Sequence, residues 1–246
     1  KLKVPTTYWC CVNCPGNPDA WKRHAVYHKK VKRHRTRWED GGAHQQRDRE
    51  TAEEQARIAA QSGDEYSGLL ADAARYAAKQ DTRRAARACR EAIALRPDRP
   101  SAYHNLGVVL SNSGHVVEAA QRFLEAKELL PVGSEDWAAA TAAAFNKLTQ
   151  PVCAEVAKPE WWNDKELKAL SARVVRAAPD DVEASQMRAL VLSGRCDTRD
   201  ARPRSAADLI EAATHYERCV ALCGAPALKA ALAVDAAWCR SRADAM

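Results

Sequence analysis

Small and apolar residues recur at helical spacing from about residue 66 to the end of the chain. In residues 101–131 they recur every three or four positions on both sides of Gly114, and Pro131 ends the pattern. The recurring residues are Tyr103, Leu106, Gly107, Leu110, Ala119, Phe123 and Ala126. This spacing predicts two antiparallel amphipathic helices joined by a tight turn at Gly114.

The same pattern occurs 34 residues earlier in the chain. Its residues there are Leu69, Ala73, Tyr76, Ala85, Ala92 and Pro97. Gly107 and Ala119 carry little bulk, so two helices can approach closely at these positions, and Phe123 fills the wider gap between helix pairs. The two in-register copies resemble the tetratricopeptide repeat (TPR), a helix–turn–helix unit of about 34 residues.

Downstream the repeat becomes irregular. A helix begins at Trp137, but its partner is delayed by an insertion at 149–164 and then starts after Asn163, a predicted helix cap. The chain is therefore predicted to be all-α, a TPR-like right-handed superhelix preceded by a basic Cys/His-containing N-terminal extension. The predicted segments are the extension at 1–44, a helical connector at 45–65, repeats at about 66–99, 100–133, 134–179 and 180–224, and a capping helix at 225–246.

The resemblance implies a concave face, lined by the first helix of each repeat, that binds a peptide or helix of a partner protein. The residues expected to line this groove include Leu70, Ala74, His104, Val108, Ser111 and Phe145. TPR domains that bind acidic chaperone tails carry Lys and Asn at set groove positions. Of these only Asn105 agrees here, and the others hold Leu70, Ala74, Glu135 and Ala139, so we exclude that specificity. The small, apolar groove suits an amphipathic helix instead.

The connector offers one such helix within the chain. Residues 47–63 are helix-prone and carry a weak apolar face. They have two interpretations: a cap that packs on the first repeat, or an occupant of the groove that competes with a ligand.

The insertion contains two adjacent tryptophans, Trp161 and Trp162. Neighbouring side chains of an extended segment point in opposite directions, so one ring can pack inward while the other faces out. Two interpretations follow: both rings plug the third repeat, or one of them anchors a partner subunit, as aromatic residues commonly do at interface centres.

The net charge of +6 is concentrated at the start of the chain. Residues 1–40 hold ten of the 38 Lys and Arg but three of the 32 Asp and Glu, a local charge of +7. The residues expected to make basic contacts are Lys22, Arg23, Lys29, Lys30, Lys32, Arg33, Arg35 and Arg37. Interleaved aromatic residues suit RNA or single-stranded DNA, but the same segment also suits an acidic protein surface or plain solvation.

The same segment carries a candidate zinc site. Cys11 and Cys14 form a C-x-x-C pair, and His24 and His28 share one face of a predicted helix. Two thiolates and two imidazoles are the ligands of a tetrahedral zinc site, although the spacing from Cys14 to His24 is shorter than in common zinc fingers. The alternative interpretation is a basic arm with incidental Cys and His residues.

Other function classes find little support. The sequence has no Gly-rich phosphate loop and no G-x-S-x-G motif, so no catalytic site is expected. No apolar run is long enough to predict a transmembrane segment. The nine cysteines are an odd number and mostly scattered, which favours a reducing compartment: cytoplasm, nucleus, or the interior of an organelle such as a chloroplast or mitochondrion.

The sequence thus predicts a non-enzymatic TPR scaffold or adaptor that binds protein partners, as a subunit or assembly factor of a larger intracellular complex. The alternative is an RNA-associated protein that binds nucleic acid through its zinc-finger-like basic N-terminal segment.

Metal analysis separates the two interpretations of the N-terminal segment. If Cys11, Cys14, His24 and His28 bind zinc, the purified protein should contain about one equivalent, and Cys14→Ser should release it because it removes a thiolate ligand. Elemental analysis by mass spectrometry measures both. Metal-free protein whose N-terminal segment is ordered against a partner would contradict the zinc site.

Overall fold

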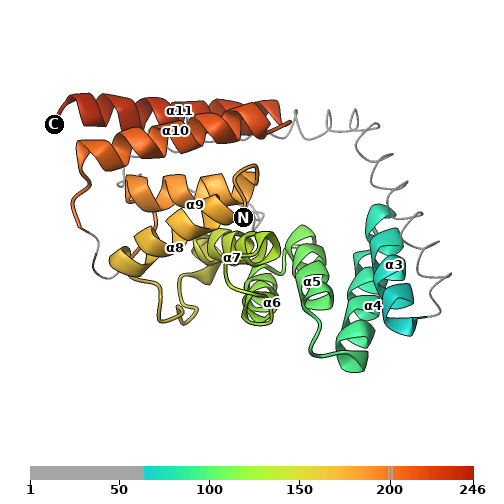
Figure 1. Ribbon diagram of the computed structural model, residues 1–246. Helices are drawn as coiled ribbons and strands as arrows, with labels where there is room; N and C mark the ends of the chain where they lie inside the picture. Colours follow the sequence, from blue (N-terminus) through green and yellow to red (C-terminus); the bar gives the residue numbers. More distant parts are fainter. Residues whose placement is uncertain (1–63, 199, 201) are drawn as a thin grey trace, which may run out of the picture.

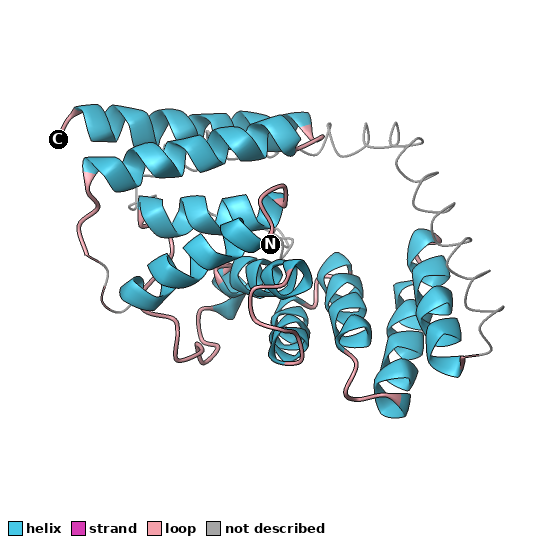
Figure 2. Ribbon diagram, viewed as in Figure 1, coloured by secondary structure: helices cyan, strands magenta, loops and turns pink. Residues whose placement is uncertain are grey.

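The computed structural model describes residues 64–198, 200 and 202–246, and the secondary structure of these residues is entirely helical (Figures 1 and 2). The all-α prediction is confirmed for this part of the chain. The helices are α3 (Glu65–Ala78), α4 (Thr82–Leu95), α5 (Pro100–Asn112), α6 (Val116–Glu128), α7 (Glu135–Leu148), a 3-10 turn η2 (Pro151–Cys153), α8 (Asp164–Ala177), α9 (Val182–Ser193), α10 (Ala206–Leu222) and α11 (Pro226–Asp244). The predicted extension and nearly all of the connector lie outside the described residues.

The helices form an extended row in which each packs mainly on its neighbours in sequence. From α3 to α7 every helix contacts the next one, and the row continues through α8, α9, α10 and α11 to the C-terminus (Figure 1). The row departs from this simple order where α3 contacts α5 and where α7 contacts both α8 and α9. The contact between α7 and α9 brings the start of α9 close to α7.

Local sequence signals set the helix ends. Gly114 has the positive φ of +84° that a tight turn between α5 and α6 requires. The side chain of Asn163 accepts a hydrogen bond from the Glu166 amide at the start of α8, which confirms it as the predicted cap. At α9 the cap is Asp181, which accepts a hydrogen bond of 2.6 Å from the Ala184 amide.

The core consists of alanine-rich helix contacts with a few large side chains between them. Phe123 lies among α3–α7, Phe145 and Trp162 among α6–α9, and Tyr216 among α9–α11. Five of the six described cysteines are buried and none of the six forms a disulfide, so these five behave as small buried apolar residues. Among the described helices, none has both the length and the apolar character needed to cross a bilayer.

Gly107 makes the closest approach between two helices possible. A Cβ atom built on Gly107 would lie 2.8 Å from Cε1 and 2.9 Å from Cδ1 of the Phe123 ring. That ring is buried, with 2% of its surface exposed. The glycine therefore leaves the space into which Phe123 packs.

We expect Gly107→Ala to lower the melting temperature. Forcing the buried Phe123 ring to move should cost about 1–3 kcal/mol, which exceeds the helix-propensity gain of about 0.5–1 kcal/mol. Gly68→Ala is the matched control, because that helical glycine has no atom within 4 Å of the added Cβ and should stabilise the protein. Thermal unfolding by circular dichroism measures both. Equal stabilisation by the two substitutions would contradict this account of Gly107.

Candidate functional site

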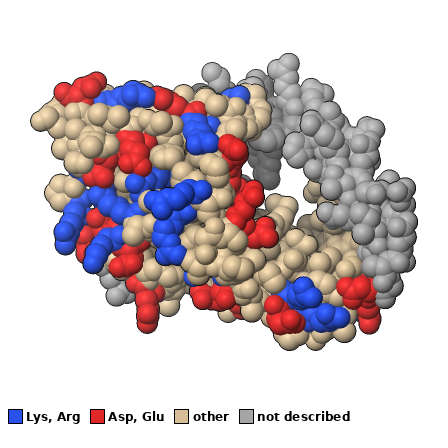
Figure 3. Space-filling model, in the orientation of Figure 1, with Lys and Arg blue, Asp and Glu red and all other residues tan. Residues whose placement is uncertain are grey.

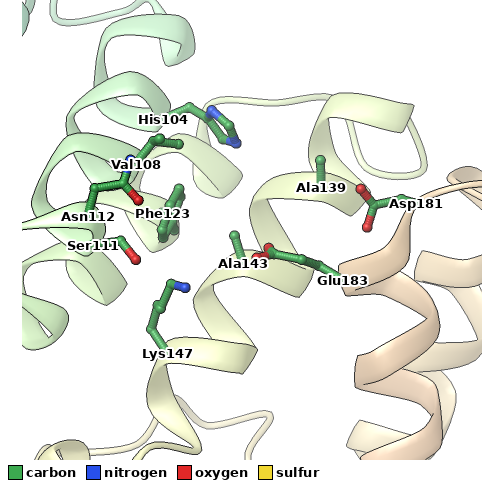
Figure 4. Close-up of a pocket in the computed structure, with 10 residues that line it drawn as sticks. All are labelled: His104, Val108, Ser111, Asn112, Phe123, Ala139, Ala143, Lys147, Asp181 and Glu183. Carbon is green, nitrogen blue, oxygen red and sulfur yellow. The ribbon is translucent and has the colours of Figure 1, made fainter. Parts of the chain in front are cut away.

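A cavity of about 310 Å³ opens between α5, α6, α7 and the start of α9 (Figure 4). Its lining combines apolar side chains with titratable ones. The lining residues are His104, Val108, Ser111, Asn112, Phe123, Ala139, Ala143, Lys147, Asp181 and Glu183. Three of the predicted groove residues, His104, Val108 and Ser111, therefore come together here.

His104 forms one wall of the cavity. Its ring meets the edge of Phe123 in a T-shaped arrangement, with 5.3 Å between ring centroids. Burial lowers the pKa of His104 below its usual value, and the carboxylates of Asp136 and Asp181 only partly oppose this shift. The imidazole is therefore neutral near pH 7 and can act as either a hydrogen-bond donor or an acceptor.

Glu183 forms the opposite wall, in the first turn of α9. Burial raises the pKa of its carboxyl, Asp181 adds to the shift, and Lys147 opposes it. Figure 4 shows the side chains of Glu183 and Lys147 both reaching into the cavity. Among the described residues neither side chain takes part in an ion pair or hydrogen bond, in contrast to Asp181, which caps α9.

The remaining predicted groove residues do not line this cavity. Leu70 and Ala74 lie half-buried on α3. Phe145 is fully buried among α7, α8 and α9 and stacks on Trp162, with 5.1 Å between ring centroids. The structure corrects its expected orientation, since Phe145 belongs to the core and not to the groove face.

The expected orientation of Phe145 assumed a repeat spacing of 34 residues. Between the cavity-lining residues of α5 and those of α7 the spacing is 35 residues. The cavity is lined on α5 by His104, Val108 and Asn112, and on α7 by the residues 35 positions later, Ala139, Ala143 and Lys147. The α6–α7 connection, 129–134, is longer than the α4–α5 connection, 96–99. One residue rotates a helix by about 100°, so the 34-residue extrapolation selected the wrong face of α7 and missed Lys147.

The sequence also missed Asp181 and Glu183 as site residues. Glu183 lies in the first turn of α9, and nothing in the sequence indicated that this turn lies against α7. Asn146 helps to fix that arrangement, because its side-chain amide donates a hydrogen bond of 3.4 Å to the Glu183 carbonyl. This is a tertiary contact between segments 37 residues apart.

The two tryptophans of the insertion differ in environment. Trp162 is buried, and its Nε1 donates a hydrogen bond of 2.7 Å to the carbonyl of Asp197. Trp161 is half-buried, packs against the same core, and lies 5.7 Å from Trp162 between ring centroids. Trp162 is thus the inward ring. A partner-anchoring role for Trp161 stays a prediction.

No cluster of three or more His, Cys, Asp or Glu suited to a metal ion occurs in the described part of the chain. The predicted zinc ligands Cys11, Cys14, His24 and His28, and the basic residues from Lys22 to Arg37, lie outside it. Comparison with protein-family models found no match to the chain, and comparison with curated proteins found none either.

The Glu183→Gln variant should gain stability relative to the parent as pH rises from the ordinary Glu pKa of about 4.3 through the raised pKa of Glu183. The folded-state pKa of Glu183 lies above its unfolded value, so ionisation costs the folded state stability as pH rises through that window. The amide cannot ionise and escapes this cost. Melting temperatures measured across the range test the prediction.

Glu118→Gln is the control for this measurement. Glu118 also lies in the first turn of a helix, α6, but it is exposed and outside the cavity. The Glu118→Gln variant measures the effect of removing a charge from the first turn of a helix at an exposed position. A Glu183→Gln difference that stays constant or shrinks with rising pH would contradict the assigned environment.

Proposed function

We propose that the protein is a non-enzymatic, TPR-like scaffold or adaptor that binds a segment of a partner protein across α5, α7 and α9. It would serve as a subunit or assembly factor of a larger complex. The observation that carries this proposal is the cavity itself, which collects side chains from α5, α6 and α7 and from the start of α9. A binding face built from several repeat units is what an α-solenoid offers a partner.

The chemistry of the cavity supports binding. Val108 keeps 40% of its surface exposed although it lies among apolar neighbours, so a partner can bury it further. His104, Lys147 and Glu183 supply polar groups that can orient a ligand. A mainly apolar lining with a few convergent polar groups is the usual composition of a binding site.

The alternative function, nucleic-acid binding, rests on the basic N-terminal segment. In the view of Figure 3 the described surface shows basic and acidic residues interspersed instead of one uniformly basic face. If the alternative holds, deletion of residues 1–40 should abolish nucleic-acid retention, and binding should weaken steeply with salt. If the scaffold proposal holds, protein partners of the helical array should survive that deletion.

Val108→Gln should weaken partner binding about tenfold, since it replaces an apolar contact worth about 1.5 kcal/mol when fully buried. Val117→Gln is the matched control, because Val117 is equally exposed, at 38%, but lies outside the cavity on α6. Affinity purification from the native source with mass spectrometry identifies the partner, and titration measures its affinity. Equal losses from both variants, or from neither, would contradict the proposed face.

A further inference from the structure

We propose that the cavity between α5, α7 and α9 receives one Lys or Arg side chain from the partner segment, with Glu183 as its charged acceptor. This inference rests on the proposed binding function and specifies the chemistry of the partner. The starting observation is that Glu183 and Lys147 both face the cavity but form no ion pair with each other. A half-buried carboxylate without an ionic partner gains most from a cation supplied by a ligand.

The charge balance around the cavity favours a cation over an anion. The carboxylates of Asp136 and Asp181 act on His104, and Asp181 and Lys147 act on Glu183. Two carboxylates, Asp181 and Glu183, line the cavity against the single ammonium group of Lys147, and the Asp136 carboxylate acts on His104 from outside the lining. The neutral imidazole of His104 adds no positive charge, so the electrostatic potential attracts a basic side chain.

The size and lining of the cavity fit one long side chain. Its volume of about 310 Å³ is at the lower end of the range for ligand pockets, too small for a large cofactor. Val108, Phe123, Ala139 and Ala143 supply an apolar surface for the methylene stem, and Glu183 lies where the charged end can reach it. Lys and Arg combine such a stem with a cationic head.

Lys147 adds selectivity to this arrangement. Its ammonium group would repel any further basic residue of the ligand beyond the one that Glu183 binds. A segment with one basic residue among small or apolar neighbours therefore fits better than a run of basic residues. Another protein is thus a better source of the segment than the dense basic stretch at residues 22–37 of this chain. The experiment distinguishes the two sources.

A random peptide library displayed on phage is the probe, and the full chain is the target. Peptides enriched by the parent but not by Val108→Gln identify binders of the cavity. We expect these peptides to carry Lys or Arg at one fixed position. Replacing that residue by norleucine should weaken binding about tenfold or more, the effect of losing one charge-assisted contact.

Variants of Glu183 test the acceptor. Glu183→Gln should weaken the selected peptide by a similar factor, whereas Glu118→Gln, at an exposed first-turn position, should leave its affinity unchanged. The norleucine peptide should bind the parent and Glu183→Gln equally. Glu183→Lys should reverse the selection toward Asp or Glu at the same position. Melting temperatures confirm that each variant is folded, and the peptide substitution requires no change to the protein.

The outcomes separate this inference from the function on which it rests. Cavity-binding peptides that carry an acidic residue, or no fixed charge, would overturn the cationic partner but keep the scaffold function. No peptide sensitive to Val108→Gln would overturn both. Tighter peptide binding after residues Lys22, Arg23, Lys29, Lys30, Lys32, Arg33, Arg35 and Arg37 are replaced by Gln would show that the chain's own segment competes for the cavity, and would overturn the assignment to a separate protein.

Discussion

Close approach of neighbouring helices across small side chains is the constraint on which the rest of the structure depends. Ala85, Ala119 and Ala126 have no exposed surface. Gly107 has no Cβ, and the Phe123 ring occupies the space next to it. Because alanines bury little apolar area each, the few large side chains between helices carry a disproportionate share of the packing energy. The positions of those large side chains then decide how each helix is rotated, and so which residues reach the open face.

The irregular insertion and the α9–α10 loop set the position of α9. Lys158 Nζ donates hydrogen bonds to the carbonyls of Leu148 (2.6 Å) and Cys153 (2.8 Å), which satisfies one acceptor at the end of α7 and one in η2. At the start of α8, Asp164 pairs with Arg204 at 2.5 Å, and both side chains are almost fully buried. Such a buried pair contributes little net stability because of its desolvation cost. Its role is to hold the loop against α8.

The titratable groups of the cavity lower the stability of the folded protein, whereas the apolar side chains of the core raise it. Burial disfavours the charged forms of both His104 and Glu183, so each makes the folded protein less stable over part of the pH range. Groups that cost stability and lack an internal partner are typical of binding sites, where the partner completes the missing contacts. The half-buried, unpaired polar groups of the cavity support the proposal that the open face binds a protein segment.

The sequence by itself determined the helices of the described chain and most of their ends. The three- to four-residue spacing of apolar residues fixed the helices, and Gly114 and Asn163 marked boundaries that the structure confirms. It also indicated His104, Val108 and Ser111 as neighbours on one face, because they share a single helix. These are local properties, set by backbone geometry within a few residues.

The tertiary structure alone decided which face of α7 opens to the cavity and which residues of α9 join it. A repeat spacing of 35 residues instead of 34 turned Phe145 into the core and Lys147 into the cavity, and no local pattern records that rotation. Glu183 reaches the site only because α9 packs on α7 across an insertion. Helix rotation and helix docking depend on contacts between segments far apart in the chain, so short-range periodicity cannot specify them.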